Sequence, residues 1–164
     1  MNQSGTGPVG ETPPVMLCLD ARFVKPTIVI VEDDKAVRES LRMVLETYGY
    51  AVEDFASGEA FLDQQEIGDD RFVVIDAGLP GASGLETLAR MRARNGGLET
   101  LARMRARNVG LPSVVVSARS DDEMARRARR AGALALLDKP IDIDALLRAI
   151  ERSAVRGEGV QPRA

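Results

Sequence analysis

The chain of 164 residues carries a formal net charge of −3 and is 45% hydrophobic, values that suit one globular domain of ordinary composition. This charge provides no overall attraction for nucleic acid or for an anionic membrane surface. The sequence contains no histidine, which excludes histidine general bases, histidine metal ligands and phosphohistidine.

The N-terminal segment, residues 1–25, is polar and rich in glycine and proline. It lacks the basic start and apolar stretch of a secretory signal, and no apolar run in the chain approaches the ~18 residues of a spanning helix. The single cysteine, Cys18, has no internal disulfide partner, which fits a reducing compartment. We therefore expect a disordered or loosely attached tail on a cytoplasmic protein.

Short apolar runs alternate along the chain with segments of helical periodicity. The β-branched and apolar runs predict five strands, at residues 27–31, 51–55, 71–76, 111–118 and 133–137. The amphipathic segments predict five helices, within residues 32–50, 57–66, 83–108, 121–132 and 141–154. Strict alternation implies right-handed βαβ units and a parallel sheet with helices on both faces.

The residues that follow each strand are the candidate site, because ligands of open parallel sheets bind beyond the carboxyl ends of the strands. They are Glu32, Asp33, Asp34, Asp76, Ser117, Asp138, Lys139 and Pro140. Clustered carboxylates repel one another unless a cation joins them, and a hard cation such as Mg²⁺ suits oxygen ligands. Mg²⁺ takes one or two carboxylates together with water and phosphate oxygens, so the cluster predicts a phosphoryl site.

The other side chains at this edge also fit phosphoryl chemistry. Lys139 can offer a positive charge to a phosphate oxygen, and Ser117 can donate a hydrogen bond to another. One of the aspartates can act as the nucleophile toward phosphorus. Such a transfer needs mainly positioning and charge neutralisation, which these residues provide. Asp34, beside the start of a helix, is expected to cap that helix.

Four motifs occur in order on this alternating pattern: VEDD at 31–34, IDAGLPGASG at 75–84, VVVSA at 114–118 and LDKP at 137–140. Together they resemble the receiver domain of two-component response regulators, and the SGLETL phrase is most similar to receivers of the nitrogen-fixation regulator type. The resemblance covers residues 26–155 and leaves 156–164 as a C-terminal tail. It implies a flavodoxin-like, doubly wound α/β fold with five helices and five parallel strands in the order 2-1-3-4-5.

The resemblance implies a role for each acidic residue at the predicted site. Asp76 matches the phosphorylated aspartate of the family. Glu32 and Asp33 match the acidic pair that binds Mg²⁺, with Asp33 the more direct ligand. Asp76 and the backbone carbonyl of Gly78 would complete the set of protein ligands to the metal.

The remaining site residues match the family with one departure. Ser117 resembles the switch hydroxyl that moves toward the phosphoryl group, and Lys139 resembles the lysine that contacts it. The Lys139–Pro140 peptide bond would be cis, an isomer that proline makes accessible. Leu136 stands where the family usually carries Tyr or Phe, three residues before the lysine. Leucine can pack there, so we expect Asp76 still to be phosphorylated. The inward movement of an aromatic ring that usually follows phosphorylation is not available to leucine.

The function implied by the resemblance is that of a phosphoprotein in a phosphorelay. A sensor histidine kinase would phosphorylate Asp76 in a Mg²⁺-dependent reaction, and a downstream protein or phosphotransfer protein would read the altered protein–protein contacts. Because neither tail can bury a core, we expect a single-domain response regulator. We expect it to support only its own phosphorylation and dephosphorylation, and not to be an enzyme.

Two other functions remain open. A degenerate receiver would act as a binding or dimerisation module that does not depend on phosphorylation. An enzyme of the aspartyl-phosphate type would use the same cluster on an external substrate, but no lid or substrate-binding domain follows the five-stranded unit. The arginine-rich segment 121–132 predicts a solvated face balanced by nearby acids, or a protein-docking face, and no direct nucleic-acid binding.

A phrase of thirteen residues occurs twice, at 83–95 and 96–108, and the two copies differ only where Ser83 matches Gly96. One copy supplies the third helix of a receiver, so the other is a local insertion. In one continuous helix, the apolar stripe of the second copy would lie about 140° from that of the first. Either the helix breaks between the copies or one stripe stays exposed. We predict self-association through residues 96–108, or through the face formed by the helix within 121–132, the strand at 133–137 and the helix within 141–154. The alternative is that the duplication has no effect.

Overall fold

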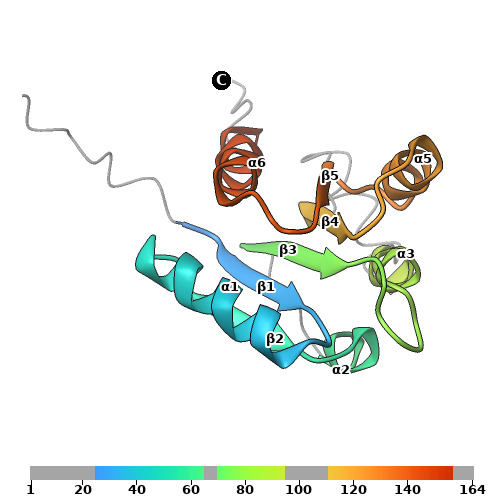
Figure 1. Cartoon of the computed structure of the whole chain (residues 1–164), viewed down its shortest axis with the longest axis horizontal. Coiled ribbons are helices and arrows are strands. Elements are labelled where there is room, and N and C mark those ends of the chain that lie inside the picture. The colour runs from blue at the N-terminus through green and yellow to red at the C-terminus, as the bar shows by residue number, and fades with distance from the viewer. Residues whose placement is uncertain (1–24, 65–69, 95–110, 157–164) are drawn as a thin grey trace, which may run out of the picture.

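The computed structural model describes residues 25–64, 70–94 and 111–156, which form an open sheet covered by helices (Figure 1). The strands are β1 (Thr27–Val31), β2 (Val52–Phe55), β3 (Arg71–Asp76), β4 (Ser113–Ser117) and β5 (Ala135–Asp138). The helices described are α1 (Lys35–Thr47), α2 (Gly58–Leu62), α3 (Gly84–Arg94), α5 (Asp122–Arg130) and α6 (Ile143–Arg156). All paired strands are parallel, in the order β2-β1-β3-β4-β5, which confirms the predicted flavodoxin-like fold.

The core has two parts, because successive side chains of a strand point to opposite faces of the sheet. Val29 and Val31 of β1 lie in a cluster with residues of α2, α3 and α5. Ile28 and Ile30 of the same strand lie in a second cluster with residues of α1 and α6. Helices α1 and α6 therefore cover one face of the sheet, and α2, α3 and α5 cover the other (Figure 1).

Asp34 caps the N-terminus of α1. Its carboxylate accepts hydrogen bonds from the backbone N–H groups of Ala36 at 2.8 Å and Val37 at 3.1 Å. These N–H groups have no partner within the helix, so a capping side chain satisfies them. The cap confirms the role expected for Asp34, and it starts α1 directly after the acidic pair of Glu32 and Asp33.

The first copy of the repeated phrase forms α3 and packs on the sheet. Leu85, Leu88 and Met91, the apolar stripe of this copy, are buried in the cluster that covers one face of β1 and β3. The second copy, residues 96–108, lies outside the described residues, as do nearly all of the two expected tails. Within the part of the chain that the structure describes, no helix combines the length and hydropathy that crossing a membrane requires.

Candidate functional site

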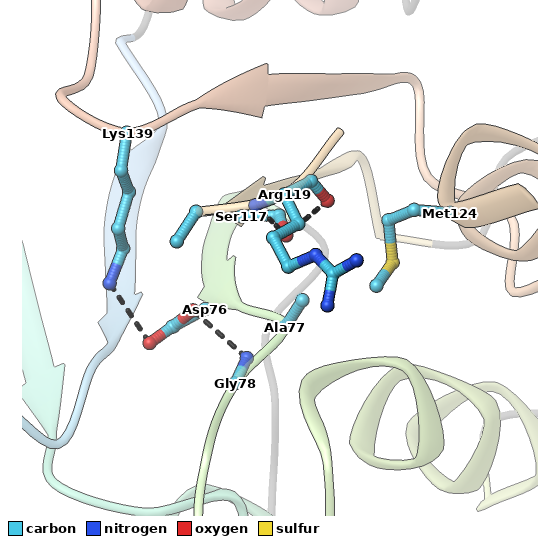
Figure 2. Close-up of a pocket in the computed structure, with 8 residues that line it drawn as sticks. Asp76, Ala77, Gly78, Ser117, Arg119, Met124 and Lys139 are labelled. Carbon is cyan, nitrogen blue, oxygen red and sulfur yellow. Dashed lines mark hydrogen bonds and ion pairs between the residues drawn. The ribbon is translucent and has the colours of Figure 1, made fainter. Parts of the chain in front are cut away.

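The predicted site residues meet at one edge of the sheet. Glu32 and Asp33 follow β1, Asp76 ends β3, Ser117 ends β4, and Lys139 follows β5. Because these four strands are parallel and neighbours in the order β1-β3-β4-β5, their carboxyl ends lie side by side. Figure 2 shows Lys139 pointing toward Asp76, with Ser117 across the same pocket.

Three carboxylates form an acidic cluster at this edge. Glu32, Asp33 and Asp76 each place one carboxylate oxygen within 4.8 Å of the others. Glu32 is 4% exposed and Asp76 is 8% exposed, whereas Asp33 is open to solvent. Burial raises the pKa of Glu32 above its usual 4.5 against the opposing hydrogen bond from Lys139, and the nearby charge of Asp76 adds to the rise.

Lys139 joins two of these carboxylates. Its Nζ lies 2.8 Å from Oε2 of Glu32 and 3.0 Å from Oδ2 of Asp76. Burial by itself would lower the pKa of Lys139, but the hydrogen bonds to Glu32 and Asp76 outweigh burial and raise this pKa above 10.5. The lysine is therefore cationic at neutral pH. One ammonium group does not balance three carboxylates, and these oxygen donors fit a hard divalent cation such as Mg²⁺.

Asp76 borders an open pocket of about 310 Å³ (Figure 2). Gly78, Ser117, Arg119 and Lys139 also line this pocket. The backbone N–H of Gly78 donates to Oδ1 of Asp76 at 3.0 Å, while Lys139 donates to Oδ2. Both oxygens of the carboxylate are thus held by donors at the place where a phosphoryl group could enter.

The Ser117 hydroxyl is engaged within its own loop. It donates to the backbone oxygen of Arg119 at 2.8 Å and accepts from the Arg119 N–H at 3.1 Å. Its residue is 5% exposed, and no hydrogen bond joins it to Asp76 within the described residues. Any bond from this hydroxyl to a phosphoryl group on Asp76 would therefore replace the bond to Arg119.

Comparison with known families identifies the family of this chain. The family model of the response regulator receiver domain matches residues 28–96 and 94–151, which together include β2, β3, β4, β5 and all of β1 except Thr27. The chain belongs to the response regulator receiver family. The two matched segments overlap at residues 94–96, which include the end of the first copy of the repeated phrase and the start of the second.

The sequence of this receiver is similar to those of transcriptional regulatory proteins. It is 35% identical over 127 residues to the transcriptional regulatory protein FixJ of Azorhizobium caulinodans, covering 77% of this chain and 54% of that protein. It is 33% identical over 132 residues to FixJ of Bradyrhizobium diazoefficiens, covering 80% of this chain and 58% of that protein. The chain thus spans a little more than half the length of these relatives.

Solved receiver structures share the fold. The crystal structure of FixJ-N is 30% identical with a TM-score of 0.61, covering 86% of this chain and 100% of that one. The structure of the response regulator StyR is 34% identical with a TM-score of 0.62, covering 82% of this chain and 61% of that one. Both support the assignment of the sheet and its helices to a receiver.

Two further positions of the receiver lie on or beside β5. The Lys139–Pro140 peptide bond is cis. Leu136, which stands where an aromatic ring is usual, pairs with Val115 of β4 and packs against the core cluster under α2, α3 and α5. The leucine therefore contributes apolar packing at this position, without a hydroxyl that could reach solvent or a partner.

The loop that follows Asp76 is tied to α2 by Glu59. Oε1 of Glu59 accepts a hydrogen bond from the Ala82 N–H at 2.8 Å. This bond is the main reason that the pKa of Glu59 lies below its usual 4.5. Periodicity marks Glu59 only as an exposed helix position, and its partner is 23 residues away, so no sequence signal identified this contact.

A Glu59→Gln variant is expected to be less stable than the wild type at neutral pH, because an amide oxygen is a weaker acceptor than a carboxylate. Since the folded pKa is lowered, the contribution of Glu59 is present above its unfolded pKa of about 4.5 and is lost as the pH falls through the folded value. The difference in free energy of unfolding should shrink in that acidic range. Urea denaturation over this range measures it; a difference that does not change with pH would contradict the expectation.

Gly84 starts α3 against the end of β3. A Cβ at residue 84 would lie 2.1 Å from the backbone oxygen of Asp76, an atom that cannot swing aside. Gly84→Ala is therefore expected to lower the free energy of unfolding by about 1–3 kcal/mol. Gly78→Ala is the matched control, because a Cβ there would meet Oδ1 of Asp76 at an ordinary 3.6 Å. Equal urea midpoints for the two variants would show that this close approach does not matter.

Proposed function

We propose that this receiver accepts a phosphoryl group on Asp76 from a sensor histidine kinase in the cytoplasm and signals through altered protein–protein contacts. The observation that supports this function is the setting of Asp76. Its carboxylate is nearly buried, borders the pocket and lies within 4.8 Å of two other carboxylates. A purely structural aspartate gains nothing from two acids beside it, since they repel its charge.

In the proposed transfer, an oxygen of Asp76 forms a bond to phosphorus while the bond from phosphorus to the donor's imidazole nitrogen breaks. The electron pair of the broken bond stays with the imidazole. The donor histidine lies outside these 164 residues, which contain none. Lys139, already 3.0 Å from Asp76, would hold the carboxylate in position and offer its charge to the phosphoryl oxygens.

The proposed Mg²⁺ site consists of Glu32, Asp33, Asp76 and the backbone carbonyl of Gly78. Its support is the donor set, three carboxylates gathered at one edge beside a single ammonium group. Mg²⁺ supplies neutralisation of the phosphoryl oxygens when it is bound. Asp33 is the exposed member of the cluster, and we expect it to be the more direct of the two ligands from the β1–α1 loop.

The proposed response starts at Ser117. Its hydroxyl would exchange its bond to Arg119 for one to a phosphoryl oxygen, which would shift the loop between β4 and α5. Leu136 can repack against its core neighbours but carries no ring, so we propose a readout through the loop rather than through an aromatic side chain. A downstream protein or a phosphotransfer protein would recognise the altered surface. The receiver would support only its own phosphorylation and dephosphorylation.

The test of this function is the intact mass of the protein after incubation with acetyl phosphate, with and without Mg²⁺. A gain of one phosphoryl group only when Mg²⁺ is present would support the proposal. No gain under conditions that label an ordinary receiver would contradict it. The chain would then act as a binding module that does not depend on phosphorylation.

A variant lacking residues 96–108 is expected to fold and to accept a phosphoryl group like the wild type, because α3 already makes its tertiary contacts. Arg92 donates to the backbone oxygen of Gly132 at 2.5 Å, and Arg94 donates to that of Leu62. We also expect fewer chains per particle in solution, because we propose self-association through this segment. Size-exclusion chromatography with light scattering measures the molar mass, which is divided by the mass of one chain. An unchanged number of chains per particle would contradict self-association, and loss of labelling would contradict the role given to the first copy.

A further inference from the structure

Arg38 of α1 binds the backbone of the loop that carries the acidic pair, Glu32 and Asp33. Nη1 of Arg38 lies 2.6 Å from the backbone oxygen of Glu32 and 3.4 Å from that of Asp33. The Arg38 side chain is only 15% exposed, unlike most arginines at a helix surface. The guanidinium of Arg38 is therefore largely removed from water, and it binds the backbone of Glu32 and Asp33, whose carboxylates belong to the acidic cluster.

Asp54 of β2 orients the guanidinium of Arg38 from the other side. Oδ1 of Asp54 lies 3.8 Å from Nε of Arg38, and Oδ2 accepts a hydrogen bond from Nε of Arg42 at 2.6 Å. Strand β2 pairs with β1, with Asp54 opposite Ile30, so this aspartate is fixed by the sheet itself. Arg38 thus links a strand, a helix and the loop between β1 and α1.

We propose that Arg38 is a positioning residue for the divalent cation, one that fixes the backbone from which Glu32 and Asp33 present their carboxylates. The inference rests on the proposed function, since it is the cation at Glu32, Asp33 and Asp76 that Arg38 would serve. Groups that orient metal ligands without touching the metal typically contribute 10–100-fold to metal affinity. A guanidinium suits this task because its several N–H donors lie in one rigid plane.

Arg42 provides a matched control on the same helix face. It shares the ion pair with Asp54 and adds one with Glu46, but its hydrogen bonds are to these side chains and not to the loop backbone. Removal of either arginine disturbs the contact between α1 and β2. Removal of Arg38 alone frees the carbonyl groups of Glu32 and Asp33. A comparison of the two therefore separates positioning of the loop from general stability.

The experiment titrates Mg²⁺ into the full chain by isothermal titration calorimetry and measures unfolding in urea without Mg²⁺. Arg38→Met and Arg42→Met are expected to lose similar stability. Arg38→Met should weaken Mg²⁺ binding by about tenfold or more, and Arg42→Met by less than about twofold. Arg38→Lys should restore part of the affinity, because an ammonium group can still donate to one carbonyl. If Arg38→Met does not fold, Arg38→Lys takes its place, and its Mg²⁺ affinity should then lie below that of Arg42→Met.

Two results would overturn the inference alone: wild-type affinity in Arg38→Met, or an equal loss of affinity in Arg38→Met and Arg42→Met. Both leave the proposed function intact, because the wild type binds Mg²⁺ in each case. A wild type that binds no Mg²⁺, or whose binding survives Asp33→Asn unchanged, would overturn the proposed metal site and the inference with it. The failure of one is thus distinguishable from the failure of the other.

Discussion

An Asp76→Asn variant is expected to gain no phosphoryl group from acetyl phosphate and Mg²⁺ under conditions that label the wild type. The amide has no anionic oxygen to attack phosphorus, so the loss should be complete rather than partial. The amide oxygen can still accept the hydrogen bond from the Gly78 N–H that now holds the carboxylate at 3.0 Å. The substitution also removes one of three mutually repelling charges, so the variant is expected to fold.

Asp138→Asn is the control for this result. Asp138 also ends a strand at the same edge of the sheet, but its side chain is exposed. We expect it to label like the wild type, as measured by intact mass on parallel samples. Labelling of Asp76→Asn, or loss of labelling in Asp138→Asn with Asp76 present, would place the acceptor elsewhere.

Lys139→Met is expected to slow labelling by about 100-fold, the usual effect of removing one donor that stabilises developing charge in a transition state. It should also lower the free energy of unfolding by about 1.5–3 kcal/mol, the range for hydrogen bonds to charged groups. The physical reason is that Lys139 is the group that bonds both Glu32 and Asp76, at 2.8 and 3.0 Å. Without it, two nearly buried carboxylates repel each other with no ammonium group between them.

The pH dependence of the Lys139→Met effect has a defined sign. The folded pKa of Lys139 is raised, chiefly because its bonds to Glu32 and Asp76 outweigh the effect of burial. Its contribution to stability is therefore fully present below the unfolded pKa of about 10.5 and is lost as the pH rises through the folded value. The stability difference from wild type should thus stay constant across neutral pH. Wild-type labelling rates in Lys139→Met would remove the lysine from the proposed mechanism.

Local sequence determined the strands and the edge at which the site lies. The runs TIVIV and RFVVID are apolar with β-branched residues, and their predicted limits, 27–31 and 71–76, agree with β1 and β3. A strand buried on both faces has no polar alternation, so its limits are marked by the first polar residues. Alternation with helices then required a parallel sheet, and a parallel sheet brings the residues after its strands to one edge.

The ends of other elements depended on distant contacts. The second helix was predicted within 57–66, whereas α2 covers Gly58–Leu62. The carbonyl of Leu62 is bound by Arg94 of α3, a partner 32 residues away. The fifth strand was predicted at 133–137 but runs from Ala135 to Asp138, where its register with β4 is set by pairing with Val114 and its neighbours. Helix and strand ends follow such partners, which periodicity does not record.

Only the tertiary structure decided which segment forms α3 and which polar side chains support the site. The two copies share twelve of thirteen residues, so their intrinsic helix propensity is nearly the same. The first copy directly follows the loop after Asp76, which puts Gly84 against the Asp76 backbone and lets Ser83 accept from the Glu86 N–H at 3.2 Å. Arg38 likewise reads as an ordinary surface arginine until folding brings Asp54 beside it. The physical reason is that periodicity reports which face of an element is apolar, whereas a polar contact depends on which distant segment folding places within reach.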